Sequence, residues 1–302
     1  MSPQRPPTID PRAAARWEAA PPAAASPWLH EEIGRRMEDR LQWIMLTPQR
    51  WAHWQPLRGG RETHALLARR FPQAACDVVE ATPAQAQAAR AALSAPWWRP
   101  GRWRAPAMRF LAGQDALAPG SVQMLWANMA LHTAADPQAL IAAWHAALAT
   151  DGFLMFSCLG PDTLRSLRAL YAELGWPPAG PEFTDMHDWG DMLVHAGFAE
   201  PVMDMERTTL TYETPERLLQ DLREIGRNLH PARFPALRGR AFRQRLLAAL
   251  RERLAAPPQE GGRLALQIEI IYGHALRPAP RAPLAAESAV SLQEMRRMLR
   301  RR

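Results

Sequence analysis

Apolar residues recur along this chain with two different spacings, and the two spacings alternate from about residue 28 onward. Between Trp28 and Leu46 they recur every three or four positions, which is typical of an amphipathic helix. Continuously apolar runs predict buried strands between further helices. These runs are Trp51–Trp54, Cys76–Ala81, Met108–Gly113, Val122–Leu131 and Gly152–Leu159, and the helical stretches between them are Glu62–Arg70, Pro83–Leu93 and Pro137–Ala149. Strands that alternate with helices predict a parallel sheet covered on both faces.

Beyond Leu159 the chain adds helices faster than strands. Strand-like stretches follow at Glu200–Tyr212 and Leu264–Leu276, and four helices are expected around them, at 162–174, 187–196, 215–229 and 238–254. Four helices are more than the connections between the last strands require. We therefore expect a helical lid, formed by about residues 160–196 and 214–254, over the carboxyl edge of the sheet.

The pattern also divides the chain into three parts. Residues 28–276 read as one large α/β domain, which the length of 302 residues can accommodate. Residues 1–27 are rich in proline and alanine and predict a flexible arm with at most a short helix near Pro11–Trp17. Residues 277–302 predict a Pro-rich linker and a short basic helix, and the Trp-rich segment 96–106 predicts a loop.

Composition narrows the possible partners. The net charge is +7 with a pI near 10.7, but all 37 basic residues are arginine, a bias typical of a GC-rich genome, and five of them lie in the last seven residues. We therefore expect no nucleic-acid partner. No apolar run of about 18 residues is present, so we expect no membrane span and a cytoplasmic protein. The oligomeric state is not indicated.

The sequence lacks the residues that disulfide frameworks, zinc clusters and phosphate loops require. Cys76 and Cys158 are too few for a disulfide framework or a zinc cluster, and each lies in an apolar run, so both are expected in the core. The absence of lysine excludes a phosphate loop of the G-x-x-x-x-G-K type. The acids and histidines from Asp185 to His195 could suggest a metal, but Thr184 and Asp185 equally suit a helix start, so we expect no metal site.

Several ordered segments resemble the malonyl-ACP O-methyltransferases of biotin synthesis and their mitochondrial relatives. RAAARWE, at Arg12–Glu18, is similar to an N-terminal signature in which tyrosine stands where this chain has Trp17. Asn128 and Leu131-His132 occupy recurring positions in the segment Pro119–Leu148, which is similar to the family's fourth strand and following helix. DGFLMFSCLGPDTLRSLR, from Asp151, is the closest match. The resemblance covers roughly residues 11–276.

The resemblance implies a fold and a reaction. The fold is a doubly wound, mostly parallel seven-stranded sheet of the class I methyltransferase, Rossmann-like type, with an N-terminal helix, a helical lid and an antiparallel last strand. The implied reaction is methyl transfer from S-adenosyl-L-methionine to a carboxylate. The implied partner is acyl carrier protein, for which we expect Arg35, Arg36 and Arg40 and the arginines of 238–253 to form the docking surface.

The resemblance also implies which residues meet the cofactor. In the family the first strand runs into D-x-G-x-G-x-G, and here that stretch is HWQPLRG. His53 therefore takes the acidic position, Gln55 and Leu57 replace two glycines, and Gly59 matches the third. Glu80, at the end of the second strand, is expected to bind ribose. The remaining candidates are Asp115 and Ala116 for adenine, Asn128 in the cofactor site, and Trp17 as the catalytic-position aromatic residue.

Three hypotheses follow from this comparison. The chain is an active O-methyltransferase, a cofactor-impaired pseudo-methyltransferase that serves as a binding or assembly partner, or an enzyme of altered chemistry such as arginine hydroxylation. Side chains at Gln55 and Leu57 obstruct close approach of the backbone to a ligand, and His53 supplies no carboxylate. We therefore expect weak or absent binding of S-adenosyl-L-methionine.

Overall fold

A computed structural model of the protein describes residues 9–94, 106–255 and 262–279. The Trp-rich segment, apart from Pro106, and the basic helix expected near the C-terminus lie outside the described residues. Among the helices that are described, none is long and apolar enough to cross a membrane.

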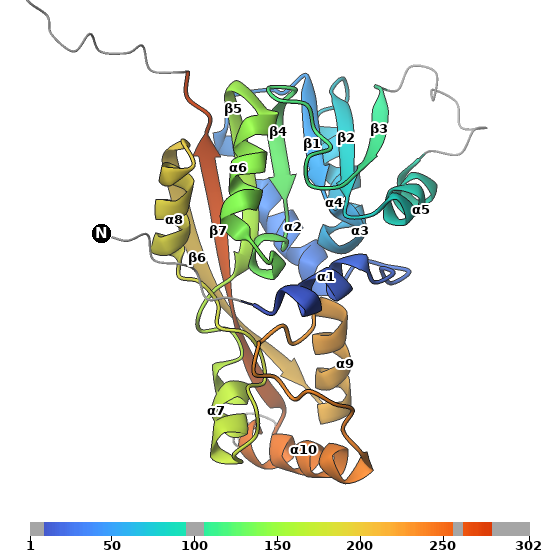
Figure 1. The fold of residues 1–302 in the computed structure, drawn as a ribbon, viewed down its shortest axis with the longest axis vertical. Helices are drawn as coiled ribbons and strands as arrows, with labels where there is room; N and C mark the ends of the chain where they lie inside the picture. The colour runs from blue at the N-terminus through green and yellow to red at the C-terminus, as the bar shows by residue number, and fades with distance from the viewer. Residues whose placement is uncertain (1–8, 95–105, 256–261, 280–302) are drawn as a thin grey trace, which may run out of the picture.

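The centre of the molecule is a seven-stranded sheet in the order β3-β2-β1-β4-β5-β7-β6 (Figure 1). Neighbouring strands run parallel except at β7, which is antiparallel to both β5 and β6. This arrangement confirms the doubly wound sheet with an antiparallel last strand. The strands are β1 (Arg50–Trp54), β2 (Ala75–Glu80), β3 (Met108–Ala112), β4 (Val122–Ala127), β5 (Leu148–Leu159), β6 (Ala199–Tyr212) and β7 (Leu264–Leu276).

Helices cover both faces of this sheet. Met124 and Trp126 of β4 belong to one core with α2 (Trp28–Arg40), α4 (Arg61–Arg70) and α5 (Pro83–Leu93). Leu125 and Ala127 point to the opposite core, beneath α6 (Pro137–Ala147) and α8 (Met186–His195). Successive side chains of a strand alternate between faces, so a strand buried on both faces must be apolar at every position. This explains the continuously apolar runs of the sequence.

The lid is built on the overlong strands β6 and β7. Figure 1 shows these two strands continuing past the sheet as an antiparallel ribbon, around which α7 (Arg165–Glu173), α9 (Pro215–Ile225) and α10 (Arg240–Arg253) gather. Helix α8 does not join them. Although the expected lid range includes it, α8 packs on β6 and α6 as part of the sheet's own helical layer.

Two segments differ from the expectation of the sequence. The proposed flexible arm contains a short helix as predicted, α1 (Pro11–Ala19), but residues 9–27 are held by contacts with distant parts of the chain. The fourth strand ends at Ala127 and not at Leu131, and just beyond it Met129 adopts a left-handed φ of 57°, outside the extended range of regular strands. This early end leaves the segment after β4 buried at the carboxyl edge of the sheet.

Candidate active site

The loop after β1 still turns tightly into a helix, although the first two glycines of the family's D-x-G-x-G-x-G loop are replaced. Gln55 adopts a left-handed conformation, with φ of 50° and ψ of 52°, and Pro56–Gly59 then form a single helical turn, α3. Gly59 is required because a Cβ there would lie 2.8 Å from the carbonyl oxygen of Asn128. Gly60 follows with φ of 145°. The backbone path is therefore set at the two ends of the loop, and the replaced positions lie between them.

His53 does not face this edge as an acidic residue would. Its side chain is fully buried, and its Nδ1 lies 3.1 Å from Nδ1 of His64 on α4, with the two rings stacked at 5.3 Å. Burial lowers the pKa of both imidazoles, that of His64 to about 4. Both rings are thus neutral near pH 7, and the Nδ1–H of one ring donates a hydrogen bond to Nδ1 of the other. Position 53 consequently links β1 to α4.

Leu57 and Glu80 meet directly at the carboxyl ends of β1 and β2. The backbone N–H of Leu57 donates to Oε1 of Glu80 over 3.0 Å, and the Leu57 side chain is only 1% exposed. Burial raises the pKa of Glu80 to about 7, although the Leu57 hydrogen bond and the nearby Arg58 and Arg61 oppose this rise. Glu80 therefore occupies the expected place at the end of β2 and titrates near neutrality.

Asn128 is the central hydrogen-bonding residue of the edge. Its Nδ2 donates to the carbonyl oxygens of His30, at 2.7 Å, and of Gly59, while its Oδ1 accepts from the hydroxyl of Ser157 at 2.6 Å. It is 1% exposed. These bonds tie α2, the β1 loop and β5 together. Asn128 is thus a scaffold residue, a role that the sequence did not indicate.

Asp115 and Ala116 stay apart from this network. They follow β3, two strands from β1, with Asp115 exposed and Ala116 half-buried. The structure thus brings His53, Gln55, Leu57, Gly59, Glu80 and Asn128 to one edge and leaves the Asp115 carboxylate at its rim.

The N-terminal helix covers this edge and connects it to the lid. Arg58 donates to the carbonyl oxygens of Ala20, at 2.6 Å, and Glu18, at 3.2 Å. The Trp17 ring lies between two guanidinium groups, that of Arg58 at 4.3 Å and that of Arg227 at 5.1 Å. Trp17 is therefore a bridge between the β1 loop and the lid, and it has no hydroxyl for acid-base chemistry.

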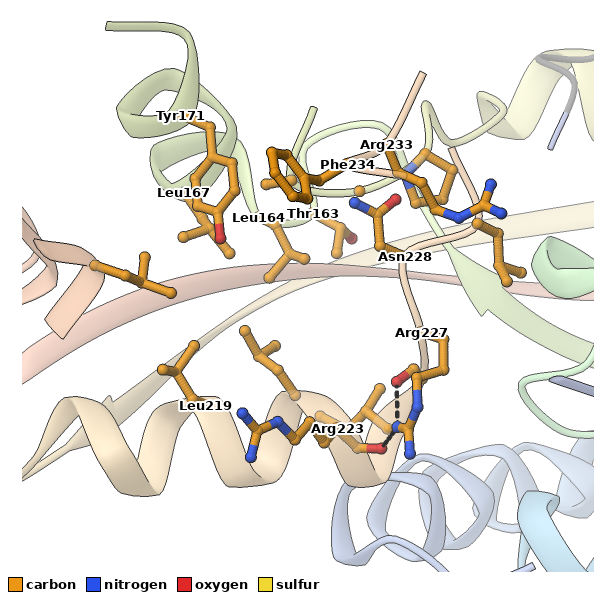
Figure 2. Close-up of a pocket in the computed structure, with 18 of the residues that line it drawn as sticks. Thr163, Leu164, Leu167, Tyr171, Leu219, Arg223, Arg227, Asn228, Arg233 and Phe234 are labelled. Atoms are coloured by element: carbon orange, nitrogen blue, oxygen red, sulfur yellow. Dashed lines mark hydrogen bonds between the residues drawn. The ribbon is translucent and has the colours of Figure 1, made fainter. Parts of the chain in front are cut away.

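A cavity of about 530 Å³ opens beneath the lid. Its walls come from α7, α9, α10 and the segment 226–239, and Figure 2 shows Tyr171, Leu219 and Asn228 among the lining side chains. His132 and Thr133, which follow β4, also contribute. Most of the lining is apolar. The charged lining residues are five arginines and no acid, namely Arg223, Arg227, Arg233, Arg238 and Arg243. Such a cavity suits an extended apolar ligand that carries a negative charge.

His132 is an unsatisfied polar group in this lining. Its Nδ1 is buried without a hydrogen-bond partner in the described part of the chain, and its ring meets Phe183 edge-on at 5.9 Å. Burial lowers the pKa of His132 to about 3, so the ring is neutral. The sequence marked this residue only as a recurring position of the resemblance. Its place directly after β4 was the signal that could have indicated a cavity residue.

Comparisons with known proteins agree with this geometry. No protein-family model matches the chain. A malonyl-[acyl-carrier protein] O-methyltransferase of Gallionella capsiferriformans is 39% identical over 85% of this chain and 87% of its own length. The protein of the same name from Laribacter hongkongensis is 40% identical over 84% of each chain. The chain belongs to the malonyl-[acyl-carrier protein] O-methyltransferase family.

Membership of this family confirms a function in S-adenosyl-L-methionine-dependent methyl transfer and gives no support to the pseudo-methyltransferase alternative. Solved structures support the fold alone. A Bacillus halodurans protein assigned as a methyltransferase covers 82% of this chain with all of its own, at a TM-score of 0.55 and 13% identity. The YcgJ protein of Bacillus subtilis covers 83% in the same way, with a TM-score of 0.53 and 13% identity.

The residues present fit the family's cofactor on one side of the site. The Glu80 carboxyl, at the end of β2, and Asp115, beyond β3, suit the ribose and adenine as the resemblance implies. The methionine side departs from the family. There His53 is turned onto His64, and the Leu57 side chain stands where a glycine would leave space. The chain therefore keeps the acidic residues that the resemblance implies for the adenosine side and departs from it on the methionine side.

Proposed function

We propose that this protein methylates the free carboxylate of a malonyl group carried as a thioester on acyl carrier protein. The observation that carries the proposal is the lid cavity, whose apolar walls hold five arginines and no carboxylate. An acyl thioester with a terminal carboxylate matches both properties, because its chain is apolar and its end is anionic. The name borne by the relatives, malonyl-[acyl-carrier protein] O-methyltransferase, agrees with this chemistry.

When bound, S-adenosyl-L-methionine supplies a methyl group that is already activated on a sulfonium. The protein therefore needs no strong general acid or base, and its task is to orient the acceptor and exclude water. Neutral His132 can hydrogen-bond a carboxylate, and the lid helices α7, α9 and α10 line the cavity in which the acceptor would lie. Trp17, between Arg58 and Arg227, keeps the two halves of the site together.

The lid also offers a surface for the carrier protein. The three arginines of α2 are already paired within the molecule: Arg35 with Glu32 and Asp39, Arg36 with Glu32 and Glu206, and Arg40 with Asp204. On α10 the later arginines Arg251 and Arg253 pair with Glu216 and Glu173. Arg240, Arg243 and Arg245 are exposed and have no carboxylate partner among the described residues. We place carrier docking on these three residues.

A direct assay tests the proposal. Purified protein is incubated with malonyl-ACP and radiolabelled S-adenosyl-L-methionine, and the carrier is analysed by mass spectrometry for a gain of one methyl group. Acetyl-ACP, which lacks the free carboxylate, is the matched control. Methylation of malonyl-ACP alone is expected. Equal labelling of both carriers, or labelling of neither at saturating cofactor, would contradict the proposal.

A further inference from the structure

We propose that Arg238 recognises the oxyanion of the acyl-thioester substrate in the lid cavity, and so determines substrate specificity. Arg238 lies just before α10, is half-buried and lines the cavity. No carboxylate pairs with it anywhere in residues 9–94, 106–255 or 262–279. A guanidinium withdrawn from water without a counterion is costly unless a ligand supplies the charge. The inference rests on the function proposed above.

Aromatic rings hold the Arg238 side chain in place. Its guanidinium carbon lies 4.2 Å from the ring centre of Phe242, 4.6 Å from that of Phe234 and 5.7 Å from that of Tyr171. Rings in contact with a guanidinium stabilise its cation but leave most of its N–H donors available. Within the described residues, the only hydrogen bond of the Arg238 side chain is a long one, 3.5 Å, from one terminal nitrogen to the Tyr171 hydroxyl. The planar guanidinium group of Arg238 is therefore held in place, while nearly all of its N–H donors remain without a hydrogen-bond partner in the described residues.

The other arginines of the cavity are engaged or exposed. Arg233 pairs with Asp10 at 2.6 Å and also donates to the carbonyl oxygen of His230. Arg227 donates to the carbonyl oxygens of Arg223 and Gly226 at the end of α9, as Figure 2 shows. Arg223 and Arg243 are exposed to solvent. Arg238 alone among the five combines partial burial, a fixed position and free donors.

The planar guanidinium of Arg238 indicates which anionic groups the ligand carries. A guanidinium binds carboxylate or phosphate through two parallel N–H···O bonds, which an ammonium cannot reproduce. An acyl group on a carrier offers two such anions, its terminal carboxylate and the phosphodiester of the pantetheine arm. Both are oxyanions on an elongated, otherwise uncharged chain, as the cavity requires. Probes that carry one of the two groups distinguish between them.

The test measures binding, so it does not depend on turnover. Malonyl-N-acetylcysteamine carries the carboxylate without phosphate, 4′-phosphopantetheine carries phosphate without the carboxylate, and acetyl-N-acetylcysteamine carries neither. Calorimetric titration compares wild type with Arg238→Met, whose side chain still packs on aromatic rings, and with Arg238→Lys, which keeps the charge but loses the fork. Arg251→Met, on the adjoining helix α10 but outside the cavity, is the matched control.

We expect Arg238→Met and Arg238→Lys to weaken one anionic probe by about ten- to a hundredfold, and Arg251→Met to change it by less than about twofold. Loss confined to the malonyl probe identifies the carboxylate, and loss confined to phosphopantetheine identifies the phosphate. Unchanged affinity of both probes in a folded variant overturns the inference. If Arg238→Met does not fold, Arg238→Lys decides alone. Arg238-dependent binding without methylation by wild type would contradict only the proposed function, and methylation without such binding only this inference.

Discussion

The loop after β1 and the cavity beneath the lid both border the N-terminal helix, yet their polar groups are in opposite states. In the loop, Leu57 N–H, the Gly59 carbonyl and the Arg58 side chain all have partners within the protein. In the cavity, Arg238 has almost none and His132 Nδ1 has none in the described residues. A site prepared for a ligand leaves its donors unused, whereas a saturated one must exchange contacts to admit a ligand.

This difference separates the two halves of the reaction. Under the proposed function the lid cavity is the acceptor side, and it has the character of a preformed binding site. On the donor side, side chains of the protein itself occupy positions where the family has glycine, and the methionine side lacks the usual carboxylate. Cofactor affinity and acceptor affinity should therefore respond to different substitutions, and the following experiments examine that separation.

The largest effect is expected for Leu57→Ala. This side chain is 1% exposed and part of the main core, so its truncation should lower the free energy of unfolding by about 2–5 kcal/mol. Affinity for S-adenosyl-L-methionine should rise at the same time, because space opens beside the loop backbone. Urea unfolding and calorimetric titration measure the two quantities. Leu67→Ala, a fully buried residue of α4 in the same core, should destabilise without improving affinity, and an equal change in both variants would refute the role of Leu57.

Glu80 should make cofactor binding depend on pH. Its pKa of about 7 means that the carboxylate able to accept two ribose hydroxyls is a minor species at pH 6 and the major one at pH 8. Affinity for S-adenosyl-L-methionine should thus increase roughly tenfold between these values. Titrations at both pH values test this, with Glu80→Gln as the variant that should lose the pH dependence. A flat wild-type profile would show that Glu80 does not bind the ribose.

The same pKa predicts a change in stability with the opposite trend. Because the folded-state pKa of Glu80 lies above the ordinary value of 4.5, the folded state holds the proton more tightly than the unfolded chain. The Glu80 contribution to stability is therefore present below about pH 4.5 and is lost as the pH rises through about 7. Relative to wild type, Glu80→Gln should gain about 2–3 kcal/mol between pH 4.5 and pH 8 in urea unfolding.

A smaller effect is expected on the acceptor side from surface charge. Replacing Arg240, Arg243 and Arg245 by glutamine should weaken binding of acyl carrier protein at low salt by about fivefold, because unpaired arginines attract an acidic partner. The same replacement of Arg35, Arg36 and Arg40 should change it by less than about twofold, since these side chains already pair with acids of the protein. Surface plasmon resonance can compare the two triple variants, and a stronger loss in the second would relocate the docking surface to α2.

The smallest effect concerns the bridge between the two sites. Trp17→Ala removes two contacts with guanidinium groups and should cost about 1 kcal/mol of stability, whereas Trp17→Tyr should cost about 0.5 kcal/mol or less. Denaturant unfolding is sensitive enough when Trp43→Ala, a residue 80% exposed, serves as the control. A Trp17→Tyr variant as unstable as Trp17→Ala would mean that the indole packs in a way that no smaller ring can replace.

The sheet could be predicted closely from the sequence, since its signal is local. The strand-like stretches at Leu264–Leu276 and Glu200–Tyr212 match β7 and β6 within one residue. The first is apolar because β7 is buried along most of its length, whereas β6 lies at the edge of the sheet and its side chains largely alternate between half-buried and exposed. The turn at Met129, just after β4, was not predictable in the same way. Its positive φ depends on contacts of the loop backbone with β5, which include the bond from Met129 N–H to the Ser157 carbonyl.

The candidate site was predicted only in part, because its partners are distant in sequence. Position 53 was correctly placed at the end of β1, but the direction of its ring depends on His64, which lies on another element. The Asp10–Arg233 ion pair and the bond from Asp10 N–H to the Leu229 carbonyl hold the arm. They join segments more than 200 residues apart, and no local pattern encodes such pairing. Arg238 was noticed only as surface charge, since its aromatic neighbours come from α7, the preceding loop and α10.

The ribbon formed by β6 and β7 makes the part of the lid that contains α9 and α10 an exchangeable module. Tyr212 and Leu264 face each other in register at its far end, so the chain leaves and re-enters the ribbon at adjacent positions. Everything from Glu213 to Arg263, including α9 and α10, could be cut out and replaced by a tight hairpin turn or by the corresponding segment of a relative without disturbing the order of the strands. Chimaeras joined at these two residues would transplant acceptor recognition between family members while the donor half stays constant.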